Sequence, residues 1–306
     1  MAWTTWYAAL YRIGTCPILL IFGVIPQFVR QMSAASRSSP DVVVILPSMK
    51  LALTVVVVVV AVAAAGMHGQ TLQPAVPAGS QQDRLVPGLA VYTNEVLFGD
   101  VWVRPQLSPR DRSLVVISVL IATNKPAQLQ GHLGRALNNG VTPMEASGVL
   151  THLAVYSGWP SAVSALDVFE QVYTARKVDL SSLRAAASPL PEPAWEPARE
   201  RMANEQFGTI APKFAELTNS LVFDNLWRRS DLSVRDRSLV TLAALAGMGD
   251  DDQLEFYLRR GVESGLSRDQ IAEAFTHLAF YAGWTKATKA MDATARVLGT
   301  APSSAR

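Results

Sequence analysis

The sequence has little cysteine and little histidine. Its 306 residues include one cysteine, Cys16, near the N-terminus, and four histidines. Because the rest of the chain has no thiol, a disulfide framework, a thiolate metal site and a cysteine redox cycle are excluded there. The histidines form no His-x-x-x-His pair and no acidic cluster accompanies them, so we expect no metal site.

An excess of charge of either sign is also absent. The formal net charge at pH 7 is +2, which is too small to indicate a nucleic-acid partner. No glycine-rich phosphate loop is present. The composition is 49% hydrophobic, and the length is sufficient for two globular domains.

Long apolar runs are confined to the N-terminal part. Residues 51–65 are apolar apart from one threonine, follow Met49 and Lys50, and end in small residues. This order is typical of a secretory signal, and the run is shorter than the roughly 20 residues of a membrane helix. We expect a signal peptide over residues 49–69 and a secreted or periplasmic protein. The alternative is a retained anchor as the sole membrane contact, and residues 1–48 are an extension that a start at Met49 would remove.

The remaining sequence contains an internal repeat. Residues 107–115 (LSPRDRSLV) reappear as 232–240 (LSVRDRSLV), and residues 151–159 (THLAVYSGW) reappear as 276–284 (THLAFYAGW). Both offsets are 125 residues, which indicates a duplication. A proline-rich segment over 188–198 reads as a linker, so we expect a first domain over 70–187 and a second over 199–306.

Each copy is predicted to be helical. Ser108 and Ser233 are candidate N-caps, and the apolar run 114–122 indicates a buried helix. A second helix is expected over 127–139, ended by Gly140. A third should begin at a capping box, at Thr142 in the first copy and Ser267 in the second, and a fourth should run from about 160 to 173. With no alternating strand pattern, the predicted class is all-α.

Four short motifs carry a resemblance to a known family. They are Arg-x-Arg-Ser-Leu at 110–114, Gln-Leu-x-x-His at 128–132, Ala-Leu-x-x-Gly-Val-Thr-Pro-x-Glu at 136–145 and Leu-Ala-Val-Tyr-x-Gly at 153–158. In these motifs the chain resembles the carboxymuconolactone decarboxylase family, within the alkylhydroperoxidase-like superfamily. The resemblance implies two tandem copies of one all-α domain, packed as a pseudo-dimer that assembles further into a trimer.

The resemblance also bears on the chemistry. Peroxidase members of the superfamily use a Cys-x-x-Cys pair, whose positions fall here on Lys125 and Gln128, so a thiol peroxidase is excluded. The decarboxylase branch needs no cofactor and removes CO2 from a carboxylated γ-lactone. Such a site must hold the carboxylate, stabilise the developing oxyanion and protonate carbon.

His132 is our first candidate for the acid or base of this reaction. It lies on the inner face of the predicted second helix, where the other interpretation is a histidine satisfied within the core. Tyr257 stands at the equivalent position of the second copy, which predicts an altered second site. Arginine is suited to hold a carboxylate, so the catalytic candidates are His132, Arg110, Arg112 and Tyr257, with surface salt bridging as the alternative role of the arginines.

The remaining candidates are predicted to bind substrate. A histidine and a tyrosine four residues apart recur in both copies, on one helix face, where they line a pocket or fix helix packing. Two tryptophans follow them and wall a pocket or a subunit contact, unless they pack in the core. The predicted substrate-binding residues are His152, Tyr156, Trp159, Arg235, Arg237, His277, Tyr281 and Trp284.

The sequence therefore predicts a cofactor-independent, decarboxylase-like lyase for a small carboxylated lactone or related organic acid. Two alternatives stay open at this point. One is a non-catalytic homologue that binds a small ligand or has a structural role, and the other is a biosynthetic isomerase or cyclase.

Overall fold

The computed structural model describes residues 76–184, 189–193 and 196–299, and these contain helices and no strand. The all-α prediction is thus confirmed. Cys16, His68 and the predicted signal peptide lie outside the described residues, among which no helix is long and apolar enough to cross a membrane. The elements are α4 (Gln81–Leu85), α5 (Pro87–Val91), η2 (Tyr92–Phe98), η3 (Val101–Val103), α6 (Pro109–Ala122), α7 (Pro126–Asn138), α8 (Pro143–Tyr156), α9 (Trp159–Ser164), α10 (Leu166–Ala175), η4 (Leu180–Leu183), α11 (Glu196–Phe207), α12 (Pro212–Leu217), η5 (Thr218–Phe223), η6 (Leu226–Arg228), α13 (Val234–Met248), α14 (Asp251–Glu263), α15 (Arg268–Ala282) and α16 (Trp284–Leu298).

The predicted helix starts are confirmed in both copies. The Ser108 and Ser233 hydroxyls accept hydrogen bonds from the third backbone amides of α6 and α13. Thr142 and Ser267 form complete capping boxes at the starts of α8 and α15. Gly140, with φ of +92°, takes the left-handed conformation expected after the second helix. These signals lie within a few residues of one another, so sequence alone revealed them.

The predicted fourth helix differs between the copies. In the second copy it is continuous as α16, whereas in the first it is broken at Ala165 into α9 and α10. The Ala165 amide bonds to the Ala162 carbonyl three residues back, which tightens the backbone at the break. The prediction of one helix over about 160–173 was therefore wrong for the first copy. In the predicted linker, Leu190 exchanges backbone and side-chain hydrogen bonds with Arg228, and α11 begins at Glu196.

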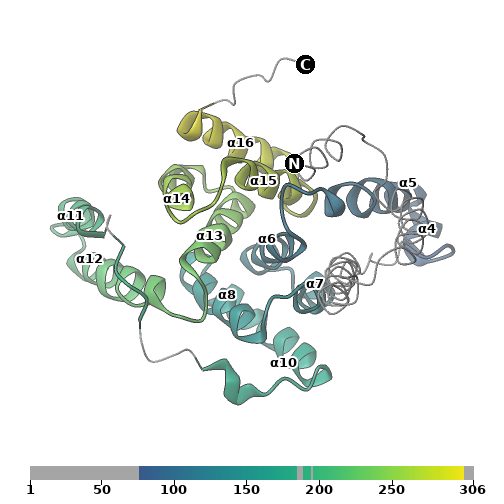
Figure 1. Cartoon of the computed structure of the whole chain (residues 1–306), viewed down its shortest axis with the longest axis horizontal. Helices are drawn as coiled ribbons and strands as arrows, with labels where there is room; N and C mark the ends of the chain where they lie inside the picture. The colour runs from purple at the N-terminus through teal and green to yellow at the C-terminus, as the bar shows by residue number, and fades with distance from the viewer. Residues whose placement is uncertain (1–75, 185–188, 194–195, 300–306) are drawn as a thin grey trace, which may run out of the picture. The chain divides into compact units, whose positions relative to one another are not determined.

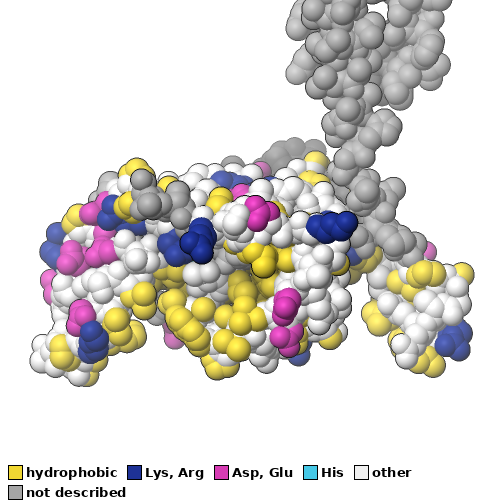
Figure 2. Space-filling model, turned by 90° about the horizontal axis from the view of Figure 1, so that it is seen from below, with side chains coloured by type: hydrophobic (Ala, Val, Ile, Leu, Met, Phe, Trp, Pro, Cys, Tyr) yellow, Lys and Arg dark blue, Asp and Glu magenta, His cyan; other side chains and the backbone are white. Residues whose placement is uncertain are grey.

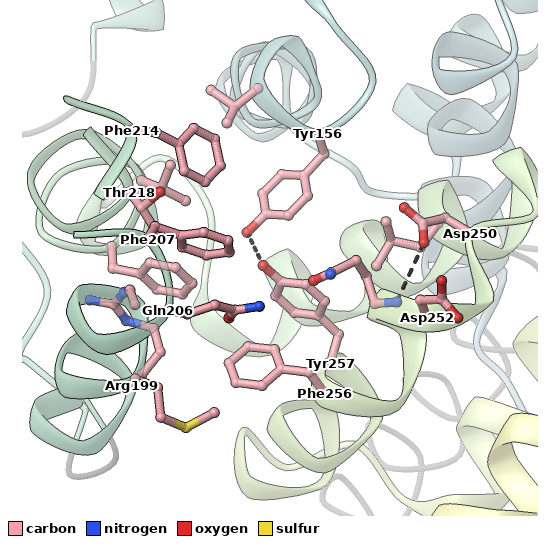
Figure 3. Close-up of a pocket in the computed structure, with 17 residues that line it drawn as sticks. Tyr156, Arg199, Gln206, Phe207, Phe214, Thr218, Asp250, Asp252, Phe256 and Tyr257 are labelled. Atoms are coloured by element: carbon pink, nitrogen blue, oxygen red, sulfur yellow. Dashed lines mark hydrogen bonds between the residues drawn. The ribbon is translucent and has the colours of Figure 1, made fainter. Parts of the chain in front are cut away.

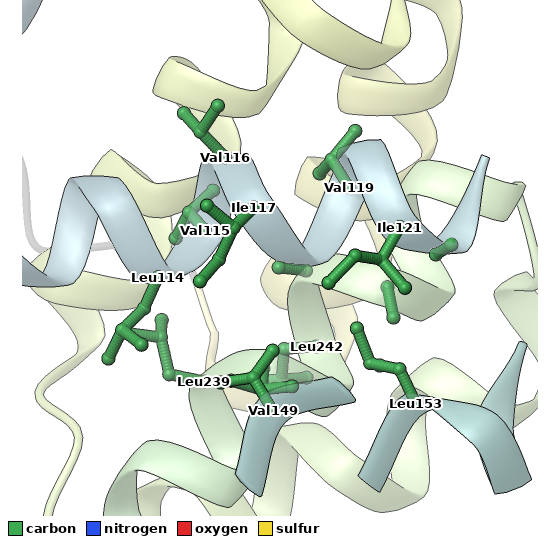
Figure 4. Packing of buried hydrophobic residues seen from close by; sticks show 14 of the residues in the cluster. Leu114, Val115, Val116, Ile117, Val119, Ile121, Val149, Leu153, Leu239 and Leu242 are labelled. Atoms are coloured by element: carbon green, nitrogen blue, oxygen red, sulfur yellow. The ribbon is translucent and has the colours of Figure 1, made fainter. Parts of the chain in front are cut away.

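The core is built around α6 and α13, which lie side by side in the middle of the molecule (Figure 1). Residues 111–122 of α6 and 236–247 of α13 are all buried, which explains why neither helix has a polar face. Figure 4 shows Leu114, Ile117 and Ile121 of α6 pointing toward side chains of α8 and α13. One apolar cluster therefore spans both copies.

The third helix of each copy packs against the first helices of both copies. α8 contacts α6 of its own copy and α13 of the other, and α15 contacts α13 of its own copy and α6 of the other. The described residues accordingly form one compact unit. This shared packing brings side chains from both copies together at two equivalent places.

Candidate functional site

Two equivalent aromatic clusters lie where the third helix of one copy meets the other copy. The first site, as we define it, consists of Trp102, His132, Arg135, His277 and Tyr281. Trp102 comes from η3, His132 and Arg135 from α7 of the first copy, and His277 and Tyr281 from α15 of the second copy. The predicted candidates His132 and Tyr281 are thus neighbours across the duplication.

The rings of the first site are ordered around Trp102. Its indole stacks on His132, with ring centroids 6.5 Å apart, and meets His277 edge-on at 4.7 Å. Its Nε1 donates to the Tyr281 hydroxyl at 3.0 Å, and Tyr281 in turn meets His132 edge-on at 5.1 Å. The Arg135 guanidinium lies over the Trp102 ring at 5.1 Å. The site therefore combines an imidazole, a phenol and a cation.

The second site consists of Trp227, Tyr257, His152, Tyr156 and Arg199. Trp227 stacks on Tyr257 at 6.0 Å and donates from Nε1 to the Tyr156 hydroxyl at 2.7 Å. The Tyr156 and Tyr257 hydroxyls are themselves hydrogen-bonded at 2.7 Å (Figure 3). The second site repeats the aromatic arrangement of the first, with a tyrosine in place of His132, but its arginine, Arg199, comes from α11 and is not the equivalent of Arg135.

His132 has an unusual environment. The residue is partly exposed, yet its Nδ1 atom is buried and has no hydrogen-bond partner. Burial, followed by the charge of Arg135, lowers the pKa of His132 to about 4. Arg135 keeps its charge at neutral pH, since burial lowers its pKa only to about 10. A neutral imidazole thus lies beside a cation.

Two further arginines are fully buried next to the sites. Arg112 donates to Glu273 at 2.8 Å and to His277 Nδ1 at 3.3 Å. Arg237 donates to Asp231 at 2.5 Å and to His152 Nδ1 at 3.5 Å. Both guanidiniums are neutralised by carboxylates of the chain itself. They therefore fix the two histidines, rather than offering a free charge to a substrate.

Arg110 and Arg235 join the two copies at the starts of α6 and α13. Arg110 donates to Asp236 at 2.8 Å and to Glu145 at 2.6 Å, and Arg235 donates to Asp111 at 2.8 Å. The pairs Arg110–Asp236 and Arg235–Asp111 are reciprocal and connect the two copies, whereas Arg110–Glu145 lies within the first copy. The structure gives Arg110 and Arg235 the salt-bridging role that the sequence left as their alternative.

Trp159 and Trp284 lie apart from both clusters. They occupy the first positions of α9 and α16, and they are 62% and 68% exposed. Core packing, one of their predicted roles, does not occur. Apolar side chains are exposed elsewhere as well, and Figure 2 shows many of them gathered on one face.

A pocket of about 520 Å³ opens at the second site. Tyr156, Tyr257 and Phe256 line it on one side, and Phe207 and Phe214 on another (Figure 3). This volume is in the range of small-molecule sites. The pocket lies at the copy that carries Tyr257, whereas our sequence analysis directed attention to His132.

Sequence reasoning missed Trp102, Trp227, Arg135 and Arg199. Arg135 could have been found, because it lies three residues after His132 on one helix and recurs as Arg260 at the same offset. The roles of the two tryptophans depend on the packing of α8 against α13 and of α15 against α6. No sequence pattern near either tryptophan predicts these roles. Within the described part of the chain, no group of three or more histidine, cysteine, aspartate or glutamate side chains could hold a metal ion.

The model of the carboxymuconolactone decarboxylase family matches residues 87–171 and 212–296, which together exceed half the chain and differ by the same 125-residue offset. The chain is similar to 4-carboxymuconolactone decarboxylase of Acinetobacter baylyi, with 37% identity over 82 residues, 27% of this chain and 61% of the relative. It is also similar to nitrosuccinic acid decarboxylase of Metarhizium robertsii, with 38% identity over 85 residues, 28% of this chain and 59% of the relative. The matches span less than two thirds of either relative.

Proposed function

Because the chain belongs to the carboxymuconolactone decarboxylase family, we propose that it is a cofactor-independent decarboxylase for a small carboxylated organic acid, with its chemistry at the first site. The observation that carries this proposal is the buried, unpartnered Nδ1 of His132 beside a guanidinium and a tyrosine hydroxyl. An unsatisfied polar atom in this setting is costly unless a ligand uses it.

The reaction requires the site to bind the substrate carboxylate, to stabilise the charge that develops on an oxygen, and to protonate carbon. The bond between the carboxylate carbon and its neighbour breaks, CO2 leaves, and the electron pair passes to an electron-withdrawing group of the substrate. A proton must then reach carbon. The relatives' substrates, a carboxylated lactone and a nitro acid, both pair a carboxylate with such a group. We therefore propose this pairing as the substrate class.

Each demand has a candidate side chain. The charged guanidinium of Arg135 binds the substrate carboxylate. The Tyr281 hydroxyl accepts from Trp102 and can donate its own proton to the oxygen on which charge develops. His132 is neutral in the free protein, but a bound carboxylate offsets the charge of Arg135 and raises the pKa of His132. The imidazole then takes up a proton and delivers it to carbon.

The test is decarboxylation by the full chain, supplied separately with 4-carboxymuconolactone and nitrosuccinic acid. We expect CO2 release with one of them, and a loss of at least about a hundredfold in kcat for His132→Gln, the usual contribution of a general acid. Tyr257→Phe is the matched control at the second site and should keep most of the activity. Equal turnover by wild type and His132→Gln would remove His132 from the mechanism. No CO2 from either acid would favour a binding role without chemistry.

A further inference from the structure

The pocket of the second site differs from the first site in its proton chemistry. Burial raises the pKa of Tyr257 to about 12 and that of Tyr156 well above its usual value. Their hydroxyls bond to each other, and His152 Nε2 bonds to the Thr241 hydroxyl at 2.8 Å. None of these groups exchanges a proton readily near neutral pH. The pocket is therefore built to bind rather than to catalyse proton transfer.

The charge of the pocket also differs. Arg199 is buried and donates to Glu196 at 2.8 Å and to Asn219 at 2.9 Å, while its guanidinium lies over the Phe223 ring at 3.9 Å. Its charge is thus already neutralised. Asp250 and Asp252 lie on the side of the pocket opposite Phe207 and Phe214 (Figure 3).

The equivalent positions of the first copy carry no acid. The 125-residue offset aligns Asp250 with Lys125 and Asp252 with Ala127. The lining of the second site is thus aromatic on one side and acidic on the other, which favours flat apolar ligands and opposes anions.

We propose that the second site binds an aromatic ligand that carries no negative charge, and that it does so independently of the carboxylate chemistry proposed for the first site. The aromatic side chains stack on the ligand, the cavity of about 520 Å³ encloses two or three fused or linked rings, and Asp250 and Asp252 reject carboxylates. The first site then binds a carboxylate, and the second site binds an uncharged aromatic ligand.

Two fluorescent probes of nearly the same shape test this preference. N-phenyl-1-naphthylamine is uncharged, and 1-anilinonaphthalene-8-sulfonate adds one negative charge to the same rings. We expect saturable binding of the uncharged probe to the full chain, with a Kd at least about tenfold lower than that of the sulfonate. Equal affinities, or tighter binding of the sulfonate, would overturn the proposal.

Variants locate the binding. Phe214→Ala removes an exposed ring that lines the pocket, and we expect it to weaken binding of the uncharged probe severalfold. Leu217→Ala is the control, because Leu217 is exposed on the same helix, α12, but does not line the pocket. If both variants bind alike, the probe occupies another apolar surface and the proposal fails.

The acidic side is tested with the sulfonate. Asp252→Asn should lower the Kd of the sulfonate probe and leave that of the uncharged probe nearly unchanged, because only charge repulsion is removed. Asp269→Asn removes the acid from the first turn of α15, outside the pocket, and should change neither Kd. His132→Gln should also leave probe binding unchanged, so failure of the proposed reaction and failure of this proposal are distinguishable.

Discussion

The first and second sites share one aromatic frame and differ in the group at its centre. In both, an indole nitrogen donates to a tyrosine that the other copy supplies, at 3.0 Å in the first site and 2.7 Å in the second. His132 stands where the second site has Tyr257. The first site therefore holds an imidazole whose Nδ1 has no hydrogen-bond partner, and the second holds two hydroxyls bonded to each other. The two copies thus place different polar groups in the same aromatic frame.

The buried ion pairs show the same divergence. Arg237 pairs with Asp231, from the loop before α13, and Gly148 faces that carboxylate from α8. At the equivalent first-copy positions, Arg112 pairs with Glu273 of α15, and Gln106 is exposed. The carboxylate that pairs with the buried arginine thus comes from the loop before α13 for Arg237, but from the third helix, α15, for Arg112. A glycine at 148 leaves room for this carboxylate, because a Cβ there would lie 3.2 Å from the Asp231 carboxyl carbon, a tight contact.

The largest effect on stability is expected when the ion pair of the second site is changed to the arrangement of the first. Asp231→Gln leaves the buried Arg237 without its carboxylate and should lower the free energy of unfolding by about 3 to 5 kcal/mol. Gly148→Glu added to this variant supplies the carboxylate from α8, as Glu273 does for Arg112, and should recover a large part of the loss. Urea unfolding of the two single variants and the double variant measures the coupling.

Comparison of the single variants with the double variant distinguishes replacement of the carboxylate from a nonspecific loss of stability. Gly148→Glu alone should destabilise, because it crowds Asp231 and places two carboxylates together. If the losses of the two single variants simply add in the double variant, the two positions are not alternative locations for one charge.

A smaller effect should appear in the pH dependence of stability. The pKa of His132 is about 4 in the folded protein, below its ordinary value of 6.5, so the unfolded chain takes up the proton first as the pH falls. Its contribution is fully present above about pH 6.5 and is lost between pH 6.5 and 4, a change of about 3 kcal/mol.

The comparison variant is His132→Gln, because glutamine does not titrate. Tyr257, at the equivalent position of the second copy, does not titrate in this pH range either. The wild type should lose about 3 kcal/mol more than this variant between pH 7 and pH 4, measured by urea unfolding at each pH. The contribution of His152, at the other site, cancels in the difference. The pKa of His277 is lowered mainly by burial and in part by His132, so the difference also includes the effect of His132 on His277. Parallel pH profiles would show that the folded protein does not depress the pKa of His132.

The smallest effect on stability is expected at the Nε2 atoms of the two buried histidines, His152 and His277. His152 Nε2 bonds to Thr241, whereas His277 Nε2 is buried with no partner because Val116 occupies the equivalent position. Thr241→Val should cost about 1 to 3 kcal/mol, since it leaves a second buried nitrogen unsatisfied. Val116→Thr should be neutral or stabilising. Thermal unfolding of both variants checks this, and a loss of stability in Val116→Thr alone would reverse the expected order.

Much of the fold could be predicted from the sequence, because its signals are local. The serine caps, the capping boxes and the apolar run of α6 each involve residues within one or two helical turns. The break at Ala165 was missed, since no proline or glycine marks it. For the candidate site, the family resemblance indicated His132, and the repeat indicated Tyr257 and the two His–Tyr pairs. Neither showed that each pair lies beside the second helix of the other copy.

The sequence by itself determined the duplication, the helical class and the family, because these follow from residue order and short-range hydrogen bonding. The tertiary structure alone decided which side chains meet. α8 and α15 pack against the opposite copy, so Tyr281 lies beside His132, and Tyr156 beside Tyr257. Burial of apolar surface stabilises this packing, and it is not directional along the chain, so no spacing in the sequence records it.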